Sequence, residues 1–224
     1  MRCLKLLPVA MILAAPMAAQ ECRGTISMRM SAGQSGQLVD TKVYIADGKQ
    51  AMVMTSPSGP MAGSEMRIVT NPAANTATIL ISTTMMPGAK GLKMVSELGG
   101  GTPPADAPAM TAKPLGTTQT IAGMRCEDYE VTSEGQVMRM CMTEALGRFA
   151  LPDMSGGARG PQRPGWVQAF GNRALFPLKV TSADSRTSME VTAVERGAPP
   201  AAMFDESPEG YATMPAGMPG MRRN

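Results

Sequence analysis

Short runs in which apolar and polar residues alternate dominate the chain, and turn residues separate them. In 22–30, for example, Ile26, Met28 and Met30 share one side of an extended strand and polar residues fill the positions between them. This period of two is typical of half-buried β-strands. Further strands are expected at 41–45, 49–55, 65–70, 76–82, 117–124, 175–183 and 187–196, and 91–98 is either another strand or a short helix. The pattern predicts a mainly β protein with ten or more short strands in a curved antiparallel sheet.

Turn signals join several of these runs into hairpins. Ala46-Asp47-Gly48 lies between 41–45 and 49–55, and the segment 71–75, which contains Asn71, Pro72 and Asn75, lies between the next two runs. Asp-Gly pairs favour tight hairpin turns. The run 79–81 is apolar on both faces, which predicts a central strand.

The first twenty residues read MRCLKLLPVAMILAAPMAAQ. Two basic residues precede an apolar run of about ten residues, and Pro16 and small residues follow it, as in a secretory signal peptide. The run is too short to span a bilayer, and no later segment approaches the length of a membrane span. We therefore expect residues 1–20 to be a signal peptide and the protein to be exported, to the periplasm or beyond the cell.

The remaining chain has the length of one domain. We expect a single β-rich domain at 21–212, with a flexible Gly/Pro/Ala-rich loop at 99–114 and a disordered tail at 213–224. A second long loop is expected at 151–164. Short helices are expected at 165–172, where Trp166 and Phe170 are four residues apart, and from Met203-Phe204.

Composition excludes several classes of function. Loss of Arg2 and Lys5 with the signal changes the net charge from +3 to +1, and the chain holds only four Phe, three Tyr and one Trp. A nearly neutral chain with few aromatic residues has no electrostatic footprint for nucleic acid. The absence of histidine removes the common catalytic triads and histidine-based zinc sites. No catalytic motif is recognisable, so we expect neither an enzyme nor a cofactor.

The segment 124–143, MRCEDYEVTSEGQVMRMCMT, holds two of the four cysteines and four of the 23 methionines. If Cys126 faces Cys141 across a hairpin, Asp128 faces Arg139, and the connection is Ser133-Glu134 or Thr132–Gly135. Side chains that face each other across antiparallel strands can form a disulfide, and an exported protein meets an oxidising compartment. A bridge closing about 15 residues stabilises by about 3 kcal/mol at most. We therefore predict a Cys126–Cys141 disulfide. The partner of Cys22, the remaining cysteine after export, stays undecided.

The opposite face of this hairpin carries Tyr129, paired with Met138 in that register, together with Met140 and Met142. Arg125 and Glu127 share this face, so it can be buried only if these charges pair or reach the rim. The three methionines can line a core or an apolar ligand cavity. Alternatively, thioether sulfurs are soft ligands, and the same three residues could hold Cu(I). Methionine is spread over the whole chain, however, which favours its use as a core filler.

Two sequence motifs resemble those of a family of secreted bacterial proteins with a domain of unknown function, number 4412. The first runs through Ile121, Gly123, Cys126, Tyr129 and Val131, then Thr143, Leu146 and Gly147; the second comprises Met203-Phe204, Pro208 and Gly210-Tyr211. The resemblance implies a fold similar to the LolA/LolB lipoprotein carriers. That fold is an incomplete antiparallel half-barrel with short helices and long loops over its concave side. The resemblance brings no catalytic residues.

Three functions therefore remain open. The first is a binding or carrier protein for a lipid or another apolar ligand, lined by Tyr129, Met138, Met140, Met142, Trp166 and Phe170. The second is a Cu(I)-handling protein. The third is a structural protein with a filled core that contacts a protein partner in the cell envelope. An enzyme is disfavoured, because a surface ion pair with Arg139 is the simpler explanation for its best acids, Asp128 and Glu130.

Overall fold

In the computed structural model, the described residues include twelve strands, which form one sheet. The structure describes residues 23–32, 37–55, 63–82, 88–98, 110–133, 136–150, 169–171, 173–182 and 187–213. The predicted signal peptide, Cys22 and Trp166 lie outside these residues, as do the predicted loop at 151–164 and the tail beyond residue 213. Among the described residues, no helix is long and apolar enough to cross a membrane.

Most strands lie within a few residues of the alternating runs in the sequence. In chain order they are β1 (Gly24–Ala32), β2 (Gln37–Ala46), β3 (Lys49–Thr55), β4 (Glu65–Asn71), β5 (Thr76–Ser82), β6 (Gly91–Glu97), β7 (Thr111–Ile121), β8 (Met124–Ser133), β9 (Gln136–Thr143), β10 (Phe176–Thr181), β11 (Thr187–Arg196) and β12 (Tyr211–Thr213). A 3-10 helix, η2 (Ala201–Phe204), lies between β11 and β12. The prediction of a mainly β protein is confirmed.

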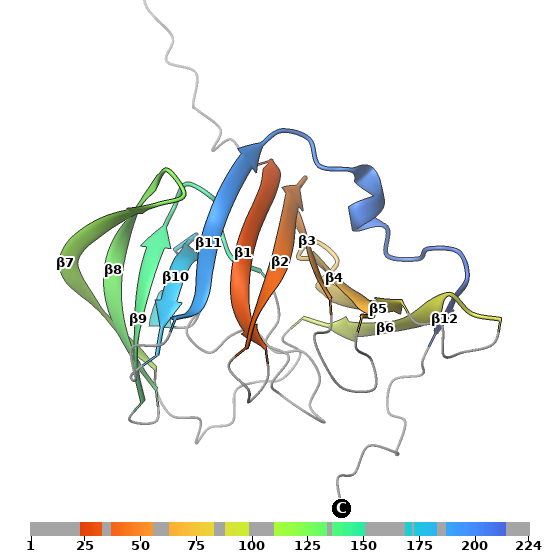
Figure 1. Cartoon of the computed structure of the whole chain (residues 1–224), viewed down its shortest axis with the longest axis horizontal. Coiled ribbons are helices and arrows are strands. Elements are labelled where there is room, and N and C mark those ends of the chain that lie inside the picture. The colour runs from red at the N-terminus through yellow and green to blue at the C-terminus, as the bar shows by residue number, and fades with distance from the viewer. Residues whose placement is uncertain are drawn as a thin grey trace, which may run out of the picture.

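The strands are ordered β12-β6-β5-β4-β3-β2-β1-β11-β10-β9-β8-β7. β1 to β6 follow one another as a meander, and β11 returns to pair with β1, which joins the second half of the chain to the same sheet. Neighbouring strands are antiparallel except β12, which runs parallel to β6. Figure 1 shows strong curvature from β7 at one end to β6 and β12 at the other, and these ends do not meet. The sheet is therefore open and curved.

Two of the tight turns have both central residues in the left-handed region. The predicted turn between β2 and β3 is one of them, with φ of 51° at Asp47 and 73° at Gly48. The second joins β7 to β8 through Ala122 (φ 49°) and Gly123 (φ 77°). This corrects the prediction of one strand over 117–124, because the chain reverses at Ala122-Gly123 and alanine is not a typical turn residue. The strand also begins at Thr111, so the predicted loop 99–114 ends too late.

Ala122 is a site where glycine is expected to stabilise the protein. An L-residue with a side chain is strained in the left-handed region, and glycine is not. We expect Ala122→Gly to raise the free energy of unfolding by about 0.5–1 kcal/mol, measured by urea denaturation. Ala112, within β7, is the matched control, because Ala112→Gly should lower stability by a similar amount. Destabilisation by both substitutions would contradict the strained turn.

One face of the sheet, called here the core face, carries the main apolar cluster. Its side chains come from both halves of the chain, and methionine contributes to it as the composition predicted. Phe149, which follows β9, packs edge-to-face on Phe176 with ring centroids 5.2 Å apart. The buried members include Ile26, Met28, Val43, Met52, Ile68, Ile79, Leu146, Phe149, Phe176, Leu178, Met189 and Val191. A core built from β1–β5 and β9–β11 explains why the two halves form one sheet.

Strands β3 to β5 are buried on the opposite face as well. Ala51, Val69 and Leu80 point away from the core face and are at most 1% exposed. The run 79–81 thus belongs to a central strand, as predicted, between β4 and β6. The segment 198–210, called here the C-terminal strap, is anchored on this side, since Arg67 Nη1 donates to the carbonyl of Ala202.

The strap leads into β12, which forms the edge of the sheet next to β6 (Figure 1). Lys90 N donates to the carbonyl of Gly210 at 2.7 Å, and the hydroxyls of Ser82 and Tyr211 are 2.7 Å apart. The Tyr211 ring lies so close to Gly91 that a Cβ there would be 2.6 Å from it. The 3-10 helix ends at Phe204, whereas the sequence predicted a helical turn that begins at Met203-Phe204.

Candidate functional site

The cysteine hairpin forms as predicted but in a different register. Cys126 and Cys141 form a disulfide with a Cα–Cα distance of 5.3 Å, and both are at most 3% exposed. Asp128, rather than Cys126, lies directly opposite Cys141, and Glu130 rather than Asp128 faces Arg139. The predicted pairing is therefore wrong by two residues. A shift of two leaves every side chain on its predicted face.

The register also moves the predicted connection by one residue. Ser133 pairs with Gln136, so two residues separate the strands, as in the first predicted alternative, but they are 134 and 135 and not Ser133-Glu134. Residues 134 and 135 themselves lie outside the described part of the chain.

The predicted apolar lining forms a second cluster on the other face of this hairpin. Met140 and Met142 are at most 2% exposed, and Tyr129 packs edge-to-face on Phe170 with centroids 5.0 Å apart. Met138 packs against the cluster as a partly buried residue. These side chains fill the space between one another, which fits the interpretation as core.

Polar groups close one side of this second cluster. The Tyr129 hydroxyl donates to Glu127 Oε2 at 2.6 Å and accepts from Arg173 Nη1 at 2.7 Å, while Arg173 also pairs with Glu144. Burial and the hydrogen bond to Glu127 raise the pKa of Tyr129, and Arg173 partly opposes this. The hydroxyl therefore stays protonated and ties Arg173 to the hairpin.

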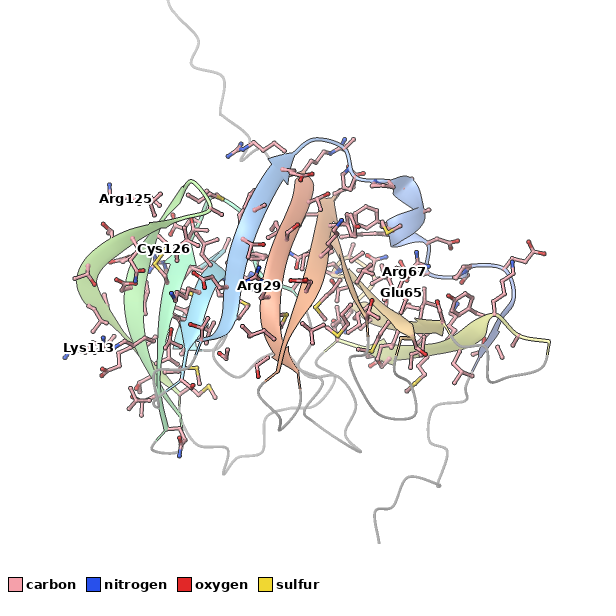
Figure 2. The ribbon with its side chains drawn as sticks, in the orientation of Figure 1. Arg29, Glu65, Arg67, Lys113, Arg125 and Cys126 are labelled. Atoms are coloured by element: carbon pink, nitrogen blue, oxygen red, sulfur yellow. A yellow bond between two sulfur atoms is a disulfide. The ribbon has the colours of Figure 1, made fainter. Side chains whose placement is uncertain are left out.

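This arrangement resolves the charges that the sequence placed on a buried face. Glu127 pairs with the Tyr129 hydroxyl, and Arg125 is exposed. Figure 2 shows Arg125 and Lys113 projecting away from the β7–β8 end of the sheet. Both conditions that the sequence allowed therefore occur: Glu127 has a hydrogen-bond partner, and Arg125 lies at the exposed rim.

A row of half-buried apolar side chains crosses the core face next to its buried cluster. Met54 lies directly opposite Met66, Met66 opposite Ile81, and Ile81 opposite Leu92. Met30 lies on the same face of β1 and, with Met54, Met66 and Ile81, packs against the buried cluster. None of these five side chains is fully buried. The sequence pattern showed each residue's face but not the alignment of the row.

The opposite face holds a groove of about 520 Å³ between β7 and β10. β7 arches there, because Leu115, Gly116 and Thr117 have no partner on β8 between Pro114 and Thr118. A bulge of this kind bends a strand and re-aims its side chains. Gly116 has a φ of 72°, which suits glycine.

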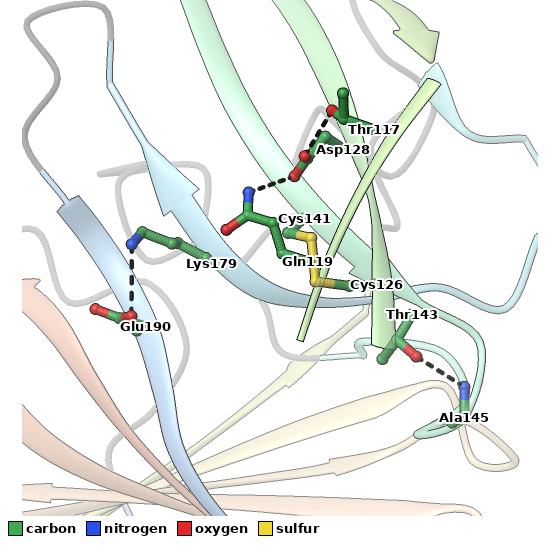
Figure 3. The surroundings of a disulfide bond; sticks show 9 residues. All are labelled: Thr117, Gln119, Cys126, Asp128, Cys141, Thr143, Ala145, Lys179 and Glu190. Atoms are coloured by element: carbon green, nitrogen blue, oxygen red, sulfur yellow. Dashed lines mark hydrogen bonds and ion pairs between the residues drawn. A yellow bond between two sulfur atoms is a disulfide. The ribbon is translucent and has the colours of Figure 1, made fainter. Parts of the chain in front are cut away.

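Charged and polar side chains line this groove, with the disulfide at its floor. Asp128 accepts hydrogen bonds from Thr117 Oγ1 at 2.8 Å and Gln119 Nε2 at 2.7 Å. Lys179 Nζ lies 3.5 Å from Glu190 Oε1. Figure 3 shows these groups around Cys126 and Cys141. The lining is completed by Leu115, Glu130, Val137, Arg139, Met140, Thr181 and Ser182.

Sequence reasoning identified Asp128, Glu130 and Arg139 but expected a surface ion pair. Instead, no ion pair of Arg139 occurs within the described part of the chain, although Glu130 lies directly opposite. The groove itself was missed, because it depends on the bulge in β7 at a position where the sequence suggested a loop. No group of three Asp, Glu, Cys or His side chains that could hold a metal occurs among the described residues.

The chain was compared with protein families, curated proteins and solved structures. Among solved structures, PNGF-II in crystal forms C2 and P21 matches with a TM-score of 0.47 each, at 12% and 11% identity. The match covers 86% of this chain but only 30% and 31% of the PNGF-II chains, so this chain spans less than a third of their length. No match is found among curated proteins.

The residues that carry the family motifs occupy structural positions. Gly123 forms the β7–β8 turn, Tyr129 and Val131 are buried in the second cluster, and Tyr211 holds β12 against β6. Residues 22–211 match the family model of a domain of unknown function (DUF4412), and no catalytic family is indicated. The chain belongs to the DUF4412 family, a family defined by a domain of unknown function.

Proposed function

We propose that the protein is an exported, non-catalytic carrier that holds a lipid or another apolar ligand against the core face of its curved sheet. The observation that carries this proposal is the row of half-buried side chains, Met30, Met54, Met66, Ile81 and Leu92. Export rests on the signal peptide expected at 1–20. The curvature of the open sheet fits a half-barrel of the LolA/LolB type, which we propose as the fold.

The row has the size and chemistry that an extended apolar ligand needs. Its aligned members run from β3 to β6, and three strand spacings of ~4.8 Å give them a length of about 14 Å. Met30 extends the apolar surface on β1, two residues further along than the position in line with Met54. Three of its five members are methionines, whose flexible thioether side chains adapt to ligands of different shape. Burying them under a ligand adds about 25 cal/mol for each Å² of apolar surface removed from water.

The side chains that the sequence suggested as the ligand lining do not form this row. Tyr129, Met140, Met142 and Phe170 belong to the second cluster and support the hairpin, so we move the proposed contact surface to β1–β6. A structural protein of the cell envelope, with a filled core, remains the alternative. That alternative predicts a protein that is empty on isolation and gains no stability from apolar ligands.

A charge introduced into the row is expected to abolish ligand binding. Met54→Glu would place a carboxylate against the apolar ligand, and an unpaired buried charge is strongly unfavourable. We expect wild-type protein to gain thermal stability with palmitate or lysophosphatidylcholine, and Met54→Glu to bind at least about tenfold more weakly. Binding is measured by calorimetry and by native mass spectrometry, and lipid extracted from the purified protein is identified by mass spectrometry.

Leu38→Glu is the matched control. Leu38 is 45% exposed on β2 and points to the opposite face, so its charge should leave binding unchanged. Unfolding curves of both variants without ligand show whether the sheet is intact. Equal loss of binding in the two variants, or wild-type protein that is empty and unaffected by either ligand, would exclude the proposed site.

A further inference from the structure

The groove on the opposite face is not needed by an apolar carrier. It lies between β7 and β10, away from the row on β1–β6, and its charges do not suit an apolar ligand. Within the described residues, Asp128, Glu130 and Arg139 make no ion pair, since the salt bridges there involve other acids and bases. Three unpaired charges facing one concavity call for a ligand of complementary charge.

Asp128 and Lys179 lie on opposite sides of the groove, while Glu130 lies directly opposite Arg139 on the neighbouring strand. Asp128 and Glu130 are alternate residues of β8 and point the same way, whereas Arg139 and Lys179 come from β9 and β10. The register aligns Asp128, Cys141 and Lys179 in one cross-strand row. Asp128 and Lys179 are therefore two strand spacings apart, which is about 10 Å between their backbones.

The Asp128 carboxylate is held in place and can accept further hydrogen bonds from a ligand. Thr117 and Gln119 each donate one hydrogen bond to a different oxygen of its carboxylate. These neutral donors fix the carboxylate without cancelling its charge, and a carboxylate has about four acceptor sites, so two remain. A ligand ammonium group is the natural partner, because charge-assisted hydrogen bonds are the stronger ones.

Arg139 is the group that would bind a negatively charged end of the ligand. Its planar guanidinium binds carboxylates through two parallel hydrogen bonds. A ligand carboxylate placed there would also lie near the Lys179 ammonium, whose contact with Glu190 is 3.5 Å long. The ligand must then carry a positive group at one end and a carboxylate at the other.

We propose that this groove binds a small zwitterion, namely a peptide of two or three residues with free ends. Three extended residues span about 10 Å, which matches the distance between the Asp128 and Lys179 backbones. A groove of about 520 Å³ lies within the size range of small-molecule sites. The ammonium end binds Asp128, and the carboxylate end binds Lys179 and Arg139.

Triglycine is the probe, and binding to the whole exported chain is measured by isothermal titration calorimetry and by NMR shifts of β8 and β9 amides. We expect triglycine to bind, and the N-acetylated and C-amidated forms, which each lack one charge, to bind at least about tenfold more weakly. Arg139→Gln should weaken triglycine binding by a similar factor and should no longer distinguish the free acid from the amide. Asp128→Asn should no longer distinguish the free amine from the acetylated form.

Lys42→Gln is the control, since it removes an exposed cation from β2 outside the groove and should leave the affinity unchanged. Thermal unfolding of each variant verifies the fold. Absence of triglycine binding at millimolar concentration would overturn the proposal, as would equal affinity for the three peptides or an Arg139→Gln variant that binds like wild type. These results leave the apolar row on the core face unaffected.

Discussion

Replacing Cys126 and Cys141 together with alanine is expected to lower the free energy of unfolding by about 2–3 kcal/mol. The bridge spans 15 residues and restricts the unfolded chain, although the hairpin connection already holds the two strands together. The sulfurs are also buried, so their removal takes packing contacts from the hairpin. The loss is measured by urea unfolding, from the shift of the midpoint at constant slope.

A reductant separates the bridge from the packing of its sulfur atoms. Dithiothreitol should shift the unfolding midpoint of the wild-type protein towards that of the double variant and leave the variant unchanged. Peptide mapping without reductant should recover Cys126 and Cys141 in one linked fragment. Free thiols at both positions in the oxidised protein would show that the bridge does not form.

The outcome at this hairpin shows what residue patterns can determine. Alternation placed Cys126 and Cys141 on one face and the methionines on the other, because side chains in a strand alternate strictly. The register was off by two residues, since pairing the cysteines directly and placing Glu130 opposite Arg139 are alternatives with the same faces. Both registers leave a connection of two residues, Ser133-Glu134 in the predicted register and 134–135 in the observed one, so the length of the connection does not select between them.

Features that depend on contacts between distant segments could not be predicted in the same way. The groove needs the arch in β7, and residues 115–117 show no sequence signal that they lack partners. The apolar lining is a related case, because methionines on one strand face pack a core or line a cavity with the same spacing. Met140 and Met142 are buried in one cluster with Phe170, whereas Met54 and Met66, which alternate in the same way in the sequence, are half-buried.

Loss of the Glu206 carboxylate is expected to destabilise the C-terminal strap and to remove part of the protein's acid sensitivity. Glu206 accepts hydrogen bonds from Lys49 at 3.0 Å, Asn71 at 3.3 Å and Thr78 at 3.3 Å. Burial alone would raise its pKa, but these donors and the charge of Lys49 outweigh burial and lower the pKa below its ordinary value of 4.5. We expect Glu206→Gln to lower the free energy of unfolding at neutral pH by about 1–2 kcal/mol, the range for hydrogen bonds to a partly exposed charged group.

The sign of the pH effect follows from the lowered pKa. A carboxyl group that is more acidic in the folded state contributes its full stabilisation above the unfolded pKa and loses it as the pH falls through the folded value. Wild-type protein should therefore lose stability more steeply than Glu206→Gln as the pH is lowered from neutrality through 4.5, and the two urea midpoints should converge.

Glu209, an exposed glutamate of the same strap, provides the control, because Glu209→Gln should follow the wild-type pH curve. Lys49→Met should reproduce part of the Glu206→Gln effect, since it removes one donor and the charge that favours the carboxylate. Parallel pH curves for wild type and Glu206→Gln would show that the strap is held without this carboxylate. In that case the strap would have to be anchored by the hydrogen bond from Arg67 to the Ala202 carbonyl and by the pairing of β12 with β6.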